Sequence, residues 1–134
     1  MSWQIRELRA DDREAWLAMS RALFPDEADM DAECAEDFDF YLSRPDVVAL
    51  VAEEQGSSSL LGMIQIETRS YAEGCGRGAV AYVEGWFVRP EHQRSGMGRA
   101  LLAAAEAWAI ARGHRQLGSN CLLDNEVSLR AHLA

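Results

Sequence analysis

The stretch Gln93–Ala100, which reads Gln-Arg-Ser-Gly-Met-Gly-Arg-Ala, decides the fold of this chain. It lies between a strand-like run over Ala79–Val88 and a helix-like run over Leu101–Arg112. Backbone N–H groups at a helix N-terminus lack internal partners, and the helix dipole adds partial positive charge there. We therefore expect this strand-to-helix turn to bind an anion such as a diphosphate.

Glycine and arginine residues suit this turn to a phosphate group. Gly96 and Gly98 carry no Cβ, so a phosphate can approach the backbone closely and the chain can adopt a positive φ. Arg94 and Arg99 add full positive charge at the rim. The pattern alone also fits a glycine-containing turn that only packs against its neighbours. The choice between the two interpretations therefore depends on the sequence on both sides of the turn.

Two common phosphate-binding motifs do not match this turn. A Walker loop ends in Gly-Lys-Ser or Gly-Lys-Thr, and this chain contains no lysine. The Rossmann fingerprint requires three glycines and a following βαβ unit, which this sequence lacks. The turn therefore indicates another way of holding a diphosphate.

Composition indicates one globular domain over residues 1–134. Hydrophobic residues make up 49% of the chain, which is enough for a single packed core. No run approaches about 18 apolar residues, and the N-terminus has no basic-then-apolar signal pattern, so we expect a cytoplasmic protein with no membrane partner. Cys34, Cys75 and Cys121 have no metal-ligand spacing, so we expect reduced core thiols and no metal.

The chain is strongly acidic, with 22 Asp and Glu residues against 13 arginines and a net charge of −9. Eight of the acids lie between Asp26 and Asp39, with no basic residue among them. Nucleic acid is not expected as a partner, because binding it depends on cationic contacts to phosphates. An acidic cleft would attract a polycationic substrate. The alternative is a solvated acidic helix face that only aids solubility.

Hydrophobic periodicity predicts an α/β domain (α+β layered), with a mixed, mostly antiparallel sheet flanked by helices. In the first helix, Trp16, Met19 and Leu23 share one face; in the second, Cys34, Ala35, Phe38 and Leu42 are expected to face inward. A glycine-rich loop is expected over Arg69–Gly78, and Gly113 is placed to end the third helix. The expected elements are a strand over Trp3–Leu8, a helix from Asp11 or Asp12 to just before Pro25, a helix over Asp31–Leu42, strands over Val47–Glu53, Leu60–Thr68 and Ala79–Val88, a helix over Leu101–Arg112, a strand over Gln116–Leu122 and a helix over Asp124–Leu133.

The turn resembles motif A of the GNAT N-acetyltransferases, through Gln-x-x-Gly-x-Gly with Pro90 shortly before it. In that superfamily the turn holds the pyrophosphate of acetyl-CoA, and the preceding strand bonds the pantetheine arm. The resemblance implies the GNAT fold and acetyl-CoA as co-substrate. It assigns coenzyme binding to Trp86, Phe87, Val88, Arg94, Ser95, Gly96, Met97, Gly98, Arg99 and Asn125.

Further stretches are similar to the aminoglycoside 6′-N-acetyltransferase branch of that superfamily. This similarity implies an enzyme that acetylates a small cationic amine, the 6′-amine of an aminoglycoside antibiotic, and that forms a homodimer. Transfer to another small amine or to a peptide N-terminus is the alternative. The stretches are Tyr82–Val88, Ala105–Ala109, Gly113 and Leu123–Ser128, and more loosely Arg21–Pro25 and Arg69–Cys75.

Glu84 and His132 are the candidate catalytic residues. The resemblance places Glu84 beside the acetyl group, where a carboxylate can accept the ammonium proton directly or through water. His132 takes the position of a tyrosine that protonates the leaving thiolate, and an imidazole can do the same or simply pack against the coenzyme. Gly85 indicates an irregularity in the strand, which would free the N–H groups of Trp86–Val88 for the thioester carbonyl.

The chain departs from the branch in two places. The branch carries an aspartate where this chain has Asn120, a loss of charge that Asp124 and Glu126 partly replace. The resemblance also implies a Leu-Gly-Phe segment and one or two strands after Ala134. We therefore expect a C-terminally truncated domain, either weakly active or an inactive coenzyme-binding module. By the same resemblance, the acceptor-binding residues are Phe24, Tyr71, Glu84 and Asn120.

Overall fold

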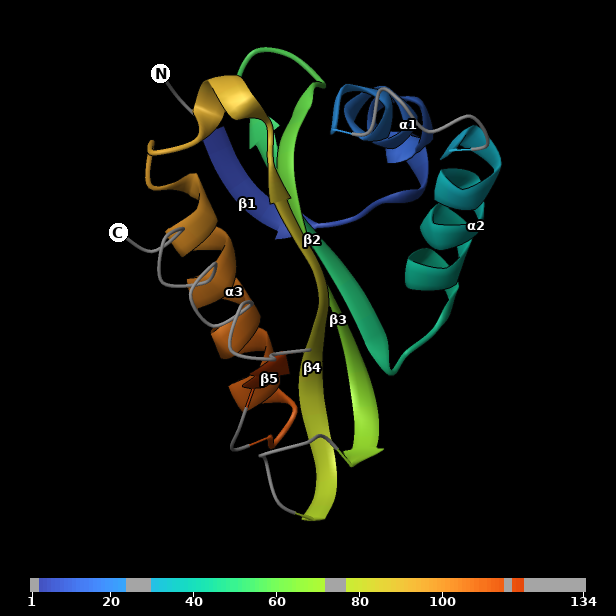
Figure 1. Ribbon diagram of the computed structural model, residues 1–134, viewed down its shortest axis with the longest axis vertical. Coiled ribbons are helices and arrows are strands. Elements are labelled where there is room, and N and C mark those ends of the chain that lie inside the picture. The colour runs from blue at the N-terminus through green and yellow to red at the C-terminus, as the bar shows by residue number, and fades with distance from the viewer. Residues whose placement is uncertain (1–2, 24–29, 72–76, 115–116, 120–134) are drawn as a thin grey trace.

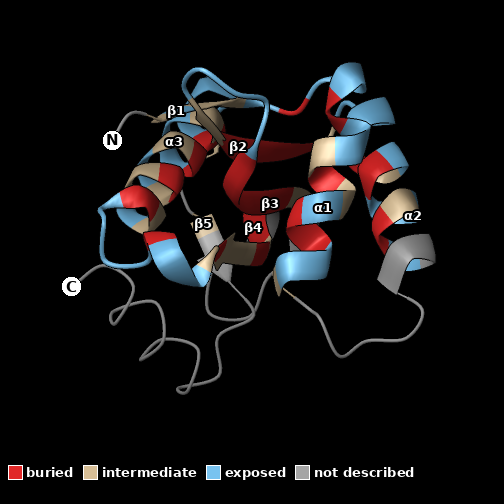
Figure 2. Ribbon diagram, turned by 90° about the horizontal axis from the view of Figure 1, so that it is seen from above, coloured by how far each residue is buried: buried red, intermediate tan, exposed pale blue. Residues whose placement is uncertain are grey.

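One sheet separates two layers of helix. The computed structural model describes residues 3–23, 30–71, 77–114 and 117–119. In these residues α3 covers one face of the sheet, and α1 and α2 cover the other (Figures 1 and 2). The elements are β1 (Trp3–Glu7), the 3-10 turn η1 (Ala10–Asp12), α1 (Arg13–Leu23), α2 (Met30–Ser43), β2 (Val47–Glu54), β3 (Leu60–Tyr71), β4 (Arg77–Val88), the 3-10 turn η2 (Pro90–His92), α3 (Met97–Ala111) and β5 (Leu117–Ser119).

The strands of the described residues lie in the order β1-β2-β3-β4-β5. Neighbours from β1 to β4 are antiparallel, whereas β5 runs parallel to β4 because α3 carries the chain from one to the other. The mixed, mostly antiparallel sheet expected from the sequence is confirmed.

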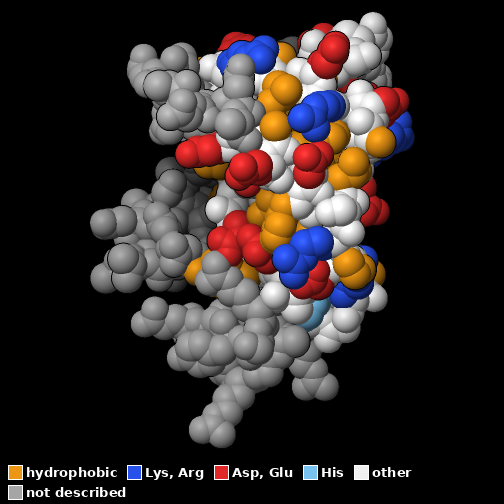
Figure 3. All heavy atoms as spheres, turned by 90° about the vertical axis from the view of Figure 1, so that its right-hand side faces the viewer, with side chains coloured by type: hydrophobic (Ala, Val, Ile, Leu, Met, Phe, Trp, Pro, Cys, Tyr) orange, Lys and Arg blue, Asp and Glu red, His pale blue; other side chains and the backbone are white. Residues whose placement is uncertain are grey.

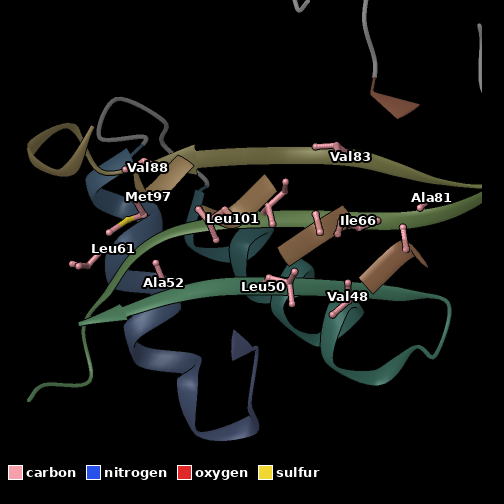
Figure 4. Close-up of a cluster of buried hydrophobic side chains, with 13 residues drawn as sticks. Val48, Leu50, Ala52, Leu61, Ile66, Ala81, Val83, Val88, Met97 and Leu101 are labelled. Carbon is pink, nitrogen blue, oxygen red and sulfur yellow. The ribbon is translucent and has the colours of Figure 1, made fainter. Parts of the chain in front are cut away.

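Strand β2, which lies between β1 and β3, is buried on both faces and supplies side chains to two hydrophobic layers. Its alternate residues Val48, Leu50 and Ala52 meet α3, as Figure 4 shows with their neighbours from β3 and β4. From α3 itself, Met97 and Leu101 are fully buried in that layer. Burial of such a side chain contributes about 1.5–3 kcal/mol relative to exposure, so this layer holds the start of α3 firmly on the sheet.

Arg6 joins β1, η1 and β2. Its guanidinium donates two hydrogen bonds to Asp12, at 2.7 and 2.8 Å, and one to Glu53 at 2.8 Å. Burial by itself raises the pKa of Asp12, but hydrogen bonds from Arg6 and from the Arg9 backbone lower it on balance. The hydrogen bond from Arg6, with a second from Gln4, lowers the pKa of Glu53 to about 2. The path of the chain into α1 is fixed by this cluster.

The inward face of α2 differs from expectation at one position. Cys34 and Phe38 are buried as predicted, but Leu42 is 39% exposed and Tyr41 is buried in its place. At about 100° per residue, position 41 lies roughly 20° from the direction of Cys34, whereas position 42 lies roughly 80° away. The Tyr41 hydroxyl also donates to Glu67 of β3 at 3.1 Å, and this hydrogen bond helps to hold Tyr41, rather than Leu42, against the sheet.

Three predicted boundaries were wrong. The expected loop over Arg69–Gly78 is largely strand, since β3 reaches Tyr71 and β4 begins at Arg77, with those two residues paired. The third helix begins at Met97, four residues before the predicted Leu101, because Gly98 is accommodated in the first turn. Gly113 ends this helix as predicted, with φ +83° and its N–H bonded to the Ile110 carbonyl. Of the last predicted strand only β5 is described, and the helix over Asp124–Leu133 lies outside the described residues.

Candidate active site

A bulge interrupts β4 at Glu84. Gln65 of β3 pairs with Gly85, and the next residue of β3 pairs with Val83, so Glu84 is the extra residue in the register. The bulge confirms the irregularity that Gly85 indicated in the sequence. A Cβ on Gly85 would overlap the side-chain oxygen of Gln65, which explains why this position lacks a side chain.

The bulge also switches the side-chain alternation of β4. Ala81 and Val83, before the bulge, pack in the layer under α3, and after it the even-numbered Trp86 and Val88 do so. Glu84 is the half-buried residue at which this alternation switches. Bulges of this kind redirect a side chain next to many active sites.

Past Val83, no described strand lies on the outer edge of β4. Within the described residues, β5 pairs with β4 from Ala81 to Val83 and no further. The described part of β5 ends at Ser119, and the last five residues of β4 follow the bulge and lead to the turn before α3. Backbone N–H and C=O groups along a strand edge can bond to an extended ligand.

Backbone alternation decides which groups face that edge. The Arg89 N–H donates to the Leu61 carbonyl of β3 at 2.8 Å. In an antiparallel pair every second residue bonds to the partner strand, so the Phe87 N–H faces β3, and the N–H groups of Trp86 and Val88 face the outer edge. The Val88 carbonyl faces the same way, since it accepts a hydrogen bond from Gln93 Nε2 at 3.2 Å.

The turn between β4 and α3 is open to an anion at Gly96. This glycine caps the start of α3 with φ +87°, makes no side-chain cap and has nothing within 4 Å of where a Cβ would be. The first hydrogen bond of the helix runs from the Ala100 N–H to the Gly96 carbonyl at 3.0 Å. The N–H groups of Met97, Gly98 and Arg99 precede it and so have no partner within the helix.

Hydrogen bonds hold the shape of this turn. Trp86 Nε1 of β4 donates to the Gly98 carbonyl of α3 at 3.2 Å, and the Ser95 hydroxyl donates to the His92 carbonyl. Gly62 of β3 also contributes, because a Cβ there would lie 3.0 Å from the Phe87 carbonyl oxygen and would also crowd two side chains of α3. The sequence analysis missed Gly62, since a glycine in a strand carries no motif that says which helix approaches it.

Charge at the turn matches a diphosphate. Arg94 and Arg99 are exposed, and neither forms an ion pair with another residue in the described part of the chain. Arg94 adopts φ +67°, a conformation that non-glycine residues rarely take and that ordered functional turns often contain. Met97 differs from its neighbours: its side chain is fully buried in the core, so it offers the turn only its backbone N–H.

On the opposite face, a cavity of about 170 Å³ lies between α1, α2 and the bulged part of the sheet. Its acidic side is α2, and Figure 3, which faces that side of the molecule, shows acidic and hydrophobic side chains mingled on the surface. The cavity lining includes Trp16, Ser20, Glu33, Asp37, Gln65 and Phe87.

The structure brings several of the predicted site residues together around the bulge and the turn. Tyr71 lies in β3, but its side chain is outside the described part of the structure, as are Phe24, Asn120, Asn125 and His132 altogether. Among the described residues, no group of His, Cys, Asp and Glu side chains is arranged to hold a metal ion. No described helix has the length and apolar character needed to cross a membrane. The predicted residues that come together are Glu84, Trp86, Phe87, Val88, Arg94, Ser95, Gly96, Met97, Gly98 and Arg99.

Comparison with known proteins shows which family the chain is similar to. The model of the acetyltransferase (GNAT) family matches residues 4–133. An aminoglycoside N(6′)-acetyltransferase type 1 of Klebsiella aerogenes is 38% identical over 97% of this chain and 86% of its own length. One of Acinetobacter baumannii is 31% identical over 89% of this chain and 80% of its own. The structure of AAC(6′)-Iy with the bisubstrate analogue CoA-S-monomethyl-acetylneamine superposes with a TM-score of 0.83 at 25% identity, covering 98% of this chain and 88% of that one.

Proposed function

Since the chain belongs to the acetyltransferase (GNAT) family, we propose that it transfers the acetyl group of acetyl-CoA to the 6′-amine of an aminoglycoside. The observation that carries this proposal is the bulge at Glu84 in β4, after which the strand leads into a turn with an open Gly96 and unpaired N–H groups at the start of α3. Both curated relatives described above are named as aminoglycoside N(6′)-acetyltransferases, which supports the choice of acceptor.

The turn before α3 is proposed to hold the diphosphate of the coenzyme. The N–H groups of Gly98 and Arg99 point out of the first helical turn, and Gly96 leaves the space beside them open. The side chains of Arg94 and Arg99 add positive charge at the rim. Ser95 donates its hydroxyl proton within the turn, so its contribution is to hold the backbone in place.

The outer edge of β4 is proposed to hold the rest of the donor. Bound acetyl-CoA supplies the activated acetyl group, as a thioester whose carbonyl an amine can attack. The N–H groups that face the edge, those of Trp86 and Val88, are suited to hydrogen-bond the pantetheine arm and the thioester carbonyl. Phe87 directs its N–H toward β3 and its side chain toward the opposite helical layer, so its role is to form the wall on the acceptor side.

Glu84 is proposed as the base. An aliphatic ammonium group must lose a proton before its nitrogen can attack a carbonyl, and a carboxylate at the bulge can take that proton directly or through water. A position at the bulge, next to Gly85 and to the Gln65 side chain that lines the cavity, supports this role for Glu84. Protonation of the leaving thiolate by His132 stays a prediction, as do coenzyme binding by Asn125 and acceptor binding by Phe24, Tyr71 and Asn120.

Two further expectations also remain predictions: the homodimer implied by the family resemblance, and the cytoplasmic location inferred from the sequence. We propose a homodimer and a cytoplasmic location. Light scattering coupled to size-exclusion chromatography measures the first, and a mass equal to that of one chain would contradict it.

The direct test is acetylation of tobramycin or kanamycin, followed by mass spectrometry of the product. We expect one added acetyl group, fragmentation that places it on the 6′-amine, and loss of rate as salt rises, because exposed charges are screened beyond about 10 Å at 0.1 M. Thiol release with a panel of other amines is the matched comparison. If other amines react and the aminoglycosides do not, the proposed acceptor class is wrong. If no amine reacts while acetyl-CoA still binds, the chain is an inactive coenzyme-binding module.

A further inference from the structure

The cavity between α1, α2 and the sheet is polar where a packed core would be apolar. Ser20 on α1 is 2% exposed and is one of the residues that line the cavity, and its buried hydroxyl has no hydrogen-bond partner among the described residues. A helical serine usually bonds back to a carbonyl of the preceding turn, and a buried hydroxyl left without a partner is costly. A ligand group in the cavity would satisfy it.

Gln65 brings the cavity next to the reaction point. Its side chain is buried, lines the cavity and extends across Gly85, the neighbour of the proposed base. An acceptor that presents one amine at the bulge on β4 therefore has this cavity directly beside it. The cavity volume of about 170 Å³ is below the roughly 300–1,000 Å³ of whole-ligand sites, so it suits one part of an acceptor.

The mouth of the cavity is acidic. Glu33 and Asp37, one turn apart on α2, both line it, and in the described part of the chain no arginine forms an ion pair with either. The only described ion pair of α2 joins Asp39 to Arg13, further along the helix. Partial burial, and then the neighbouring carboxylates Glu33, Glu36 and Glu67, raise the pKa of Asp37. A bound cation would relieve that repulsion.

Aromatic side chains provide the apolar part of the lining. Trp16 directs its Nε1 to the Cys34 carbonyl at 3.1 Å, so its polar atom is already satisfied by α2. Phe87 approaches from β4, on the same face as Gln65. Aromatic walls, one buried hydroxyl, one amide and two carboxylates together match an aminosugar ring, which is apolar on its faces and carries hydroxyl and ammonium groups at its edge.

We propose that this cavity is a second subsite for the acceptor, in which Asp37 and Glu33 bind an ammonium group other than the one acetylated, and Ser20 and Gln65 bond the ring that carries it. The proposal rests on the proposed function and narrows its substrate class to polyamine acceptors. Asp37 and Ser20 are then specificity-determining residues, separate from the catalytic Glu84.

The test compares two acceptors that share the reacting amine. Tobramycin carries further amines, whereas 6-amino-6-deoxyglucose carries only the one to be acetylated. We expect Asp37→Asn to raise KM for tobramycin by about tenfold with kcat within about twofold, and to leave KM for the simple sugar unchanged. Glu36→Gln, a carboxylate of the same helix that does not line the cavity, is the matched control and should change neither.

Ser20→Ala supplies a second measurement. It removes a buried hydroxyl that has no partner among the described residues, so Tm should stay the same or rise, while KM for tobramycin rises about threefold to tenfold. An unchanged KM for tobramycin in Ser20→Ala would contradict the role of this hydroxyl in the subsite.

Calorimetry with tobramycin separates this proposal from the proposed function. Binding to the wild-type chain that weakens about tenfold in Asp37→Asn supports the subsite even if no acetyl group is transferred, in which case only the proposed function fails. Acetylation by the wild type with the same KM and affinity in Asp37→Asn overturns the subsite and leaves the function standing. No binding of tobramycin by the wild type overturns the subsite directly.

Discussion

The two faces of the sheet are built to recognise ligands in different ways. On the α3 side, the proposed coenzyme site consists of backbone N–H groups and two arginines within six consecutive residues, 94–99. On the α1–α2 side, the proposed acceptor subsite takes Ser20, Asp37 and Gln65 from three separate elements. Recognition by backbone groups requires a particular local conformation, which a short sequence motif specifies. Recognition by side chains requires only that residues distant in the chain meet in the fold, so no sequence motif reveals it.

The largest effect should come from a charge placed in the backbone site. In Gly96→Glu, a carboxylate would meet the phosphates among N–H donors, at a position with φ +87° and open space around it. We expect the affinity for acetyl-CoA, measured by calorimetry, to fall by at least about 100-fold. Hydrogen bonds from backbone N–H groups to the phosphate oxygens and the favourable charge of the turn would both be lost.

Gly56→Glu is the matched control for this variant. Gly56 also has a positive φ, +86°, and open space, but it lies in the turn between β2 and β3. Both variants carry the same conformational strain and the same added charge. Equal loss of affinity in the two would show that the turn before α3 has no special role.

Glu84→Gln tests the proposed base at the bulge of β4. We expect coenzyme affinity near that of the wild type and turnover on an amine reduced by roughly 10²–10⁴-fold at pH 7, the usual range for a positioned acid–base group. The deficit should shrink as pH rises, because more of the free amine is already present. Steady-state rates from pH 6 to about 10 measure this, with Glu106→Gln on the exposed face of α3 as control. A full-rate Glu84→Gln enzyme would leave the residue with no catalytic role.

Gly85→Ala should disturb the contact between the bulge and Gln65. The added Cβ would collide with the side-chain oxygen of Gln65, which would have to shift within the cavity that the glutamine lines. Because the end of a flexible side chain can give way, we expect a cost of about 1 kcal/mol, the low end for overpacking, measured as a lower free energy of unfolding in urea. In the Gln65→Ala background the same glycine substitution should cost much less. An equal loss of unfolding free energy in the wild type and in Gln65→Ala would show that the strain does not come from the contact with Gln65.

The smallest effect concerns the ion cluster of Arg6, Asp12 and Glu53, which joins β1 and β2 to the turn before α1. The pKa of Glu53 is lowered from 4.5 to about 2 in the folded state, and the pKa of Asp12 is also lowered. The unfolded state therefore binds more protons, so the stabilisation is complete above about pH 4.5 and is lost as pH falls toward 2.

Urea unfolding at a series of pH values between 2 and 6 checks this sign. Glu53→Gln should flatten the dependence of unfolding free energy on pH below about 4.5. Glu54→Gln, the next residue of β2, forms no ion pair with an arginine in the described residues and is the control. A steeper dependence in Glu53→Gln would contradict the assignment.

Most elements were predictable because their patterns are local. Alternating and continuous apolar runs identified β1 to β4, and the spacing of Trp16 and Met19 identified the buried face of α1. Gly85 indicated the bulge and Gly113 the end of α3, because each serves a backbone conformation that its own neighbours specify. These predictions needed no knowledge of what packs against what.

Predictions that depended on a partner were less accurate. Leu42 was expected inside, but Tyr41 reaches the sheet and bonds to Glu67, a choice that only the position of β3 makes. The glycine-rich stretch after Thr68 was expected as a loop, but strand pairing extends into it because each strand supplies a partner for the other. The N–H groups of Trp86–Val88 were expected to act together, whereas the register with β3 divides them between two edges.

The sequence by itself determined the fold class, the family and the place of the proposed anion-binding turn, because a turn built from glycines and backbone N–H groups is encoded by adjacent residues. Only the tertiary structure decided that Glu84 is the extra residue of a bulge and that Ser20, Asp37 and Gln65 meet around one cavity. Their separations in the chain, from 17 residues between Ser20 and Asp37 to 28 between Asp37 and Gln65, exceed any local pattern. Such residues are brought together by the packing of α1 and α2 on the sheet, which follows from burial of apolar surface and from no motif.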